Sequence, residues 1–185
     1  DTTAYHYLYQ IENIQNGWQY AVSVTAFDRG NEETNLEPLE SSILANTKRV
    51  FAGTEPSKDM EANSPFVYPN PYYYGASWEG RSNFQEESRK IVFANLPAHC
   101  QVRIFTVAGD FIDEFTHSPD YAGDDIRWFR TFASEIPSEN VFSGGEHAWD
   151  LLSLSSQIIS RGLYMYSVKD LETGEVYLGK FVIVK

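Results

Sequence analysis

The stretch that decides the fold runs from Ile91 to the C-terminus. It reads IVFANLP (91–97), VRIFTVAGDFIDEF (102–115), WDLLS (149–153), RGLYMYSV (161–168) and GKFVIVK (179–185). Apolar residues alternate with polar ones over short runs, and turn residues separate the runs. This period of two is typical of half-buried β-strands. Because the last run reaches the C-terminus, we expect the end of the chain to be held in a sheet, as suits a terminal module of a larger polypeptide.

Composition agrees with an all-β chain and excludes several functions. The 185 residues are 15% aromatic, and aromatic side chains favour strands. A formal net charge of −12 argues against binding to nucleic acid or to an anionic membrane surface. There is no apolar run long enough to cross a bilayer as a helix. The chain starts at Asp1 without a signal peptide, so we expect a fragment or a processed product of an exported protein.

The chain divides into three parts. Residues 1–51 predict about three strands, with Asn16–Gly17 as a turn and a polar loop between the last two. Three strands form one sheet, which leaves an apolar face uncovered, so upstream domains or another chain are expected to complete this first domain. Residues 52–65 have the composition of a linker. Residues 66–185 predict about seven strands, enough for a small antiparallel sandwich, interrupted by an insertion over 116–145.

Two family resemblances sharpen this division. The segment from Ile11 to Thr47 is similar to the last strands of a fibronectin type III domain, with Tyr20 at the tyrosine-corner position. That resemblance implies that the Tyr20 hydroxyl bonds back to the preceding loop.

Residues 66–185 resemble the Ig-like C-terminal domains of secreted bacterial proteins. The matching patterns are the C-terminal sorting domain of the type IX secretion system and the Ig-like domain of the flagellar hook-capping protein. Two departures are Leu151, where the family has glycine after Trp149–Asp150, and the long insertion. The replacement of this glycine predicts that the turn comes later in the chain. The residues that match the motifs are Pro69, Asn70 and Pro71 in the opening YPNP, Gly162, Tyr164 and Tyr166 in the penultimate strand, and Lys180 and Lys185 in the last strand.

The resemblance implies a non-enzymatic C-terminal module of a large secreted or cell-surface bacterial protein. Its role would be sorting, attachment or structural assembly, and its partners the secretion or surface-attachment machinery, with self-assembly possible. The alternative is an accessory carbohydrate-binding module of a secreted hydrolase. The surface for that role would comprise Tyr72, Tyr73, Tyr74 and Trp78, although alternate tyrosines could instead cover the edge of the core.

The sequence predicts no catalytic residue, no cofactor and no metal site. The four histidines, His6, His99, His117 and His147, have no metal-binding spacing. The acidic run around Asp124 lacks the spacing of a calcium loop and favours a solvated loop. We interpret the single cysteine, Cys100, as a small buried residue at the start of a strand. In the insertion, Trp128, Phe129 and Phe132 are expected to pin the long loop to the sandwich, with a partner contact as the other possibility.

Overall fold

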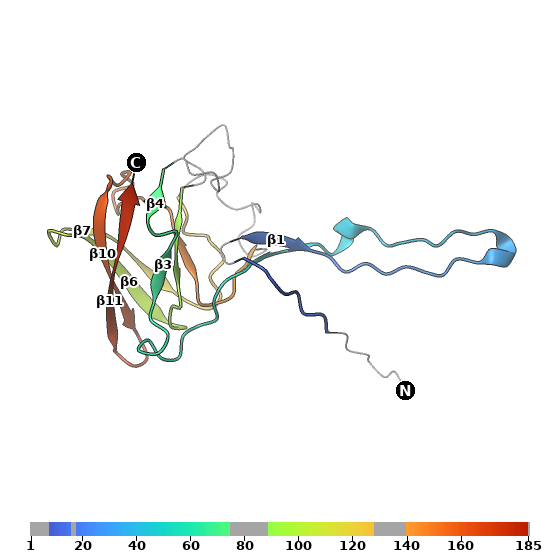
Figure 1. The fold of residues 1–185 in the computed structure, drawn as a ribbon, viewed down its shortest axis with the longest axis horizontal. Coiled ribbons are helices and arrows are strands. Elements are labelled where there is room, and N and C mark those ends of the chain that lie inside the picture. Colours follow the sequence, from blue (N-terminus) through green and yellow to red (C-terminus); the bar gives the residue numbers. More distant parts are fainter. Residues whose placement is uncertain (1–7, 16–17, 75–88, 128–139, 185) are drawn as a thin grey trace.

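The computed structural model describes residues 8–15, 18–74, 89–127 and 140–184. Within this part of the chain the regular structure is all β, as predicted, apart from two short 3₁₀ turns, η1 (Glu32–Thr34) and η2 (Ile43–Ala45). The body is a two-layered β-sandwich (Figure 1). Its larger sheet has the order β4-β11-β10-β6-β7. These strands span Tyr72–Tyr73 (β4), Cys100–Thr106 (β6), Phe111–His117 (β7), Gly162–Asp170 (β10) and Val176–Val184 (β11).

The alternation seen in the sequence decides which side chains of the larger sheet are buried. In β10, Tyr164, Tyr166 and Val168 are buried, while Leu163 and Met165 remain more than two-fifths exposed. Successive side chains of a strand point to opposite faces, so one face of β10 enters the core and the other meets solvent. The predicted turns close the two hairpins of this sheet. Gly109 (φ 91°) lies in the β6–β7 turn and Gly174 (φ 80°) in the β10–β11 turn.

A smaller antiparallel sheet forms the second layer. Its strands are β3 (Phe66–Tyr68), β5 (Ile91–Ala94) and β9 (His147–Trp149), with β5 in the centre. All of β9 is buried, and Phe93 of β5 is fully buried. The ring of Phe93 makes edge-on contacts with Phe115 and Tyr166 of the larger sheet, at centroid distances of 5.4 and 5.3 Å. Both sheets therefore contribute to one aromatic core.

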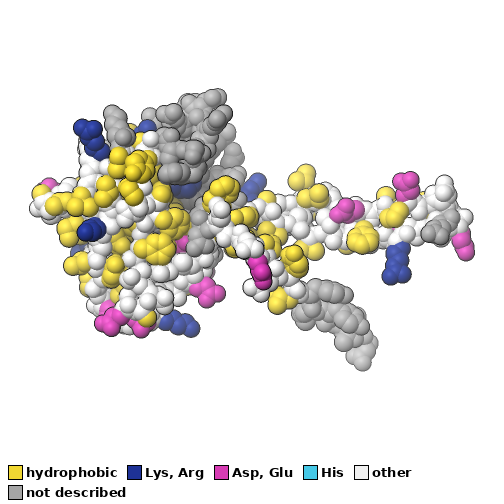
Figure 2. All heavy atoms as spheres, viewed as in Figure 1, with side chains coloured by type: hydrophobic (Ala, Val, Ile, Leu, Met, Phe, Trp, Pro, Cys, Tyr) yellow, Lys and Arg dark blue, Asp and Glu magenta, His cyan; other side chains and the backbone are white. Residues whose placement is uncertain are grey.

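Residues 18–51 form a long hairpin, the arm, which extends away from the body (Figure 1). At its base β1 (Gln19–Val22) pairs with β2 (Lys48–Phe51), and β2 pairs in turn with β8 (Asn140–Val141). Farther out, the two sides are joined by isolated bridges at Phe27–Glu40 and Asn31–Leu36 and by side-chain hydrogen bonds such as those of Asn46 to Val24. Many of the apolar side chains of the arm are exposed, which Figure 2 shows as separate hydrophobic patches along its length.

The expectation of three strands in residues 1–51 is wrong for the described part of the first one. Residues 8–15 lie outside any strand, and Leu8 and Tyr9 are 97% and 88% exposed. The sequence alternates there, but none of the strands between residues 18 and 184 that the structure describes pairs with this segment. The third strand of the arm sheet comes instead from β8 in the insertion. The tyrosine-corner contact is confirmed, because the Tyr20 hydroxyl accepts a hydrogen bond from the backbone N–H of Gln15 at 2.9 Å.

The segment 52–65 packs against the sandwich along its length. Met60 is 5% exposed and belongs to the core, and Ser57 forms a bridge with Pro97. The Thr54 carbonyl accepts a hydrogen bond from the Gly145 N–H, and the Thr54 hydroxyl donates to the Gly145 carbonyl and accepts from the Asn95 N–H. The connection between arm and body is therefore held in place by packing and hydrogen bonds.

The arm depends on the body for its third strand, so a peptide of residues 1–55 is expected to lack a fixed structure. An isolated two-stranded hairpin is marginally stable in water, and this one leaves its apolar side chains uncovered. Amide proton dispersion by NMR checks this, with residues 52–185 as the control that keeps a full sandwich. Well-dispersed signals from a monomeric 1–55 peptide would contradict the argument.

Candidate functional site

The YPNP motif lies against the last strand of the chain. The Asn70 side chain accepts a hydrogen bond from the Val182 N–H at 3.1 Å and donates one to the Lys180 carbonyl at 3.3 Å. One amide side chain therefore satisfies two backbone groups on the edge of β11 that faces away from β10. The peptide bonds before Pro69 and Pro71, on either side of Asn70, are both cis. We call Pro69–Tyr74, together with its contacts to Lys180–Val184, the terminal clamp.

The chain continues from Asn70 into β4, which extends the clamp to the end of β11. Tyr72 pairs in parallel with Ile183, and Tyr73 with Val184. The Tyr74 N–H then donates to the Val184 carbonyl at 3.2 Å. Since a parallel neighbour and a side-chain amide together cover this edge, the terminal strand is enclosed from both sides.

The penultimate strand carries the other positions of the resemblance. Gly162 pairs with Ile183 and Tyr164 with Phe181, and the Tyr164 and Phe181 rings stack with centroids 5.5 Å apart. The Tyr164 hydroxyl donates to the Ser160 carbonyl at 2.6 Å. Position 179, next to Lys180, is occupied by glycine, because the Tyr166 ring lies where the Cβ atom of any other residue would be. Lys180 is exposed, and Lys185 lies outside the described residues.

The structure separates the four aromatic residues of the possible glycan surface. Tyr72 is fully buried in the core, so it does not belong to a surface. Tyr74 is half-buried, with Arg89 4.7 Å above its ring and its hydroxyl on the Ile159 carbonyl. Tyr73 is 46% exposed, and Trp78 lies outside the described residues. Alternation along β4 explains the split, because adjacent strand residues face opposite sides.

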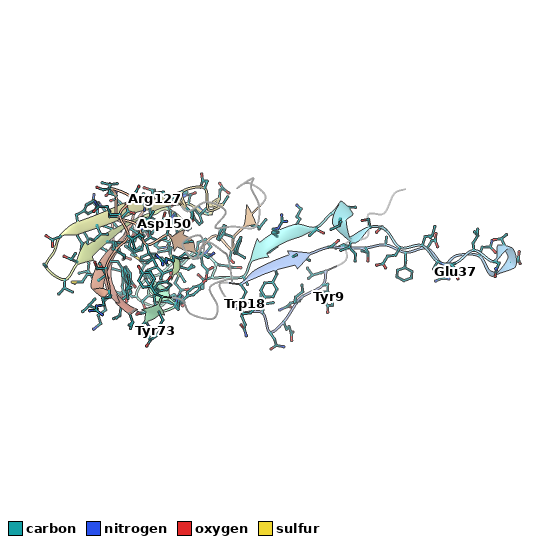
Figure 3. All side chains as sticks on the ribbon, turned by 90° about the horizontal axis from the view of Figure 1, so that it is seen from above. Tyr9, Trp18, Glu37, Tyr73, Arg127 and Asp150 are labelled. Atoms are coloured by element: carbon teal, nitrogen blue, oxygen red, sulfur yellow. The ribbon has the colours of Figure 1, made fainter. Side chains whose placement is uncertain are left out.

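Sequence reasoning missed the residue that fixes the described part of the insertion. Arg127 donates from Nε and Nη2 to the two carboxylate oxygens of Asp150 at 3.0 and 2.8 Å, and from Nη2 to Asp113 at 2.8 Å. Figure 3 shows Arg127 and Asp150 together on the body. Trp149 donates its indole N–H to the same Asp113 oxygen at 2.9 Å. The expected anchors Trp128, Phe129 and Phe132 lie outside the described residues.

Leu151, which stands where the sorting-domain pattern has glycine, adopts a backbone conformation typical of glycine. Its φ is +59°, in the left-handed region that favours glycine, and its side chain is 1% exposed. The chain reverses later, at 153–157, where the Ser153 N–H donates to the Gln157 carbonyl, as the sequence predicted. Burial of the leucine side chain offsets a conformational cost of about 1–2 kcal/mol.

A second aromatic stack joins the arm to the body. Phe51 at the end of the arm stacks on Phe142 at 4.4 Å, and Phe142 contacts Tyr121 at 4.9 Å. His147 lies between Tyr121 and Phe115, at 3.8 and 4.0 Å. Phe115 contacts Phe93, so the row of rings runs without a break from the arm into the core.

Two histidines that the sequence treats as scattered meet within this stack. The His117 and His147 rings are 5.6 Å apart, and both are almost fully buried. His117 Nε2 contacts the Gly144 carbonyl at 2.9 Å, and His147 Nε2 contacts Asp125 at 2.6 Å. We assign the proton to Nε2 in each ring, because both partners are acceptors. Burial lowers the pKa of His117 to about 4, while the Gly144 carbonyl opposes that shift.

The described residues offer little reactive chemistry. No group of three or more His, Cys, Asp or Glu side chains among them is arranged to hold a metal ion. Cys100 is fully buried, and burial together with Asp170 raises the pKa of its thiol to about 12. A thiol with this pKa stays protonated at neutral pH and is a poor nucleophile. No helix in the described part is both long and apolar enough to span a bilayer.

Comparisons with known proteins give structural neighbours only. No protein-family model and no curated protein matches the chain. One solved structure, covering 68% of this chain at 18% identity and a TM-score of 0.41, is PorZ of Porphyromonas gingivalis, an essential bacterial surface component of its type IX secretion system. Another, covering 92% at 16% identity and a TM-score of 0.36, is dimeric latent PorU of the same organism. This chain spans 12% of the length of each neighbour.

Asn70→Ala is expected to loosen the end of β11 by removing both side-chain hydrogen bonds. The expected loss of stability is about 1 kcal/mol, because the two lost hydrogen bonds lie at an exposed edge where water can replace them. Urea unfolding measures the loss, and faster hydrogen exchange at the Val182 amide localises it. Gln157→Ala, which truncates an exposed polar side chain outside the clamp, is the control. Unchanged exchange at Val182 would contradict the role assigned to Asn70.

His117 is expected to make stability depend on pH. Its pKa in the folded protein, about 4, lies below the unfolded value of 6.5, so the unfolded chain binds more protons between these values. Stability is therefore full above pH 6.5 and falls as the pH drops toward 4, by about 2 kcal/mol between pH 7 and pH 5. Urea unfolding of the wild type and of His117→Gln at both pH values checks this. An equal pH dependence in both proteins would contradict it.

Proposed function

We propose that this chain is a non-enzymatic C-terminal module that directs a large bacterial protein to the cell surface or the extracellular space. Residues 66–185 would be its Ig-like sorting or attachment domain. The observation that carries the proposal is the terminal clamp. Positions far apart in the sequence, Asn70, Tyr164 and Lys180, meet on the last two strands, where the resemblance to sorting domains places its motifs.

Recognition in this proposal uses the shape of the sandwich and the outward side chains of its last strand, because both backbone edges of that strand are paired within the chain. The clamp encloses the last strand and leaves its outward side chains accessible, with Lys180 exposed and Val182 half-buried. A receptor in the secretion or attachment machinery could read this strand without any chemical step. Rigidity supports such a role, because a fixed strand presents its side chains at constant spacing.

The proposal also assigns the remaining parts. Residues 1–51 would be the end of a fibronectin type III-like domain, and 52–65 its connection to the sorting domain. The Tyr20–Gln15 hydrogen bond supports the first assignment. The carbohydrate-binding alternative has less support, because burial of Tyr72 removes one ring from the surface it would need.

Deleting residues 179–185 is expected to unfold the sandwich, since Phe181 and Ile183 are core residues, and to stop export. This deletion alone does not separate folding from recognition. Lys180→Ala with Lys185→Ala tests recognition, because Lys180 is exposed and its truncation leaves the core intact.

The measurement is surface display of a reporter fused to residues 52–185, in a bacterium with a type IX secretion system. We expect the double lysine variant to keep the wild-type melting temperature and to lose display. Lys58→Ala, also exposed, is the matched control. A deletion variant that stays folded and still reaches the surface would refute the proposal.

A further inference from the structure

The larger sheet of the sandwich exposes an apolar face to solvent. Strand register places one row of side chains across four strands, with Met165 opposite both Lys180 and Phe105, and Phe105 opposite Phe111. The next row places Ser167 opposite Leu178 and Arg103. The apolar members of this outer face are Phe105, Phe111, Leu163, Met165, Val176 and Leu178; five of these six are 42–66% exposed, and Phe105 is partly buried.

The charges on this face are mainly positive, in contrast to the rest of the chain. Arg103 pairs with Glu114 at 3.0 Å, which cancels both charges. Lys169 and Lys180 form no ion pair with any described residue. In a chain of net charge −12, an apolar face with two unpaired lysines favours an acidic partner with apolar side chains.

The tip of the arm, residues 27–40, has that chemistry. It carries five carboxylate residues and one arginine, a net charge of −4. Phe27, Leu36 and Leu39 are 76%, 65% and 73% exposed. The tip thus combines uncovered apolar side chains with negative charge, which complements the outer face in both respects.

The arm of one molecule does not reach its own outer face. Figure 1 shows the arm leaving the body on the side opposite to β7, β10 and β11. We propose that the arm tip of one copy docks on the outer face of the larger sheet of a second copy. The contact joins two different surfaces, so it is head-to-tail, and repetition gives either a ring or an open row of molecules.

The proposal goes beyond sorting, because it gives the module a means of self-assembly. It also accounts for apolar side chains on the arm and on the sheet face that the described residues leave exposed. Glu33 and Glu37 at the tip are exposed, as Lys169 and Lys180 are on the face, so charge reversal at these positions leaves the core intact.

The test uses the full chain and sedimentation equilibrium over a range of concentrations. We expect self-association that weakens at high salt. Lys169→Glu with Lys180→Glu should weaken it by about tenfold or more, and so should Glu33→Lys with Glu37→Lys. Lys58→Glu is the matched control and should leave it unchanged. Circular dichroism and the melting temperature establish that each variant is folded.

Mixing the two charge-reversed proteins gives the sharpest result. Glu33→Lys with Glu37→Lys takes the arm tip from −4 to 0 and puts two positive side chains there, which can pair with the negative side chains at 169 and 180 of the other protein. Association should therefore return in the mixture although it is weakened in each protein alone. A wild-type chain that is monomeric at all concentrations, as expected if the arm serves only a different partner, would overturn the proposal. So would association that is indifferent to all four substitutions. Lys169→Glu alone separates this inference from sorting, because Lys169 is not a position of the sorting motif.

Discussion

Enclosure of the last strand is the constraint on which the rest of the body depends. β11 contributes Phe181 and Ile183 to the core, so it must lie inside the sheet with both edges paired. β10 pairs one edge along most of its length. The other edge is closed by Asn70 and the two residues of β4. A side-chain amide is suited to this place because it offers a donor and an acceptor at once, as a strand neighbour does.

The insertion turns a sandwich and a hairpin into one connected structure. It supplies β8 to the arm and Tyr121 to the aromatic stack, and its Arg127 is held by two carboxylates of the body. Asp113 and Asp150 are 5% and 1% exposed, and buried carboxylates are costly unless they are paired. Loss of Arg127 would leave two uncompensated charges, which costs more than the pair itself contributes. The network therefore fixes the position of the loop more than it adds to stability.

Many strands and turns of the body can be predicted from the local sequence. The features that could not be predicted depend on contacts between residues far apart in the chain. Alternation predicts the strands around Tyr164 and Phe181, and Gly174 marks the turn between them. The same alternation in residues 8–14 gives no strand, because pairing depends on a neighbour and not on pattern alone. Arg127 carries no motif, and the meeting of His117 with His147 needs two strands from different sheets.

The body and the arm also differ in how far their apolar side chains are buried. In the body, two sheets cover each other, and the remaining edge is closed from within the chain. In the arm, β8 supplies edge pairing at the base, but the described residues leave many of the apolar side chains beyond it exposed. Apolar surface without cover is stable in water only at a cost of about 25 cal/mol per Å². The uncovered apolar side chains therefore lie on the arm and on the outer face of the larger sheet, while the edge of the last strand is closed from within the chain.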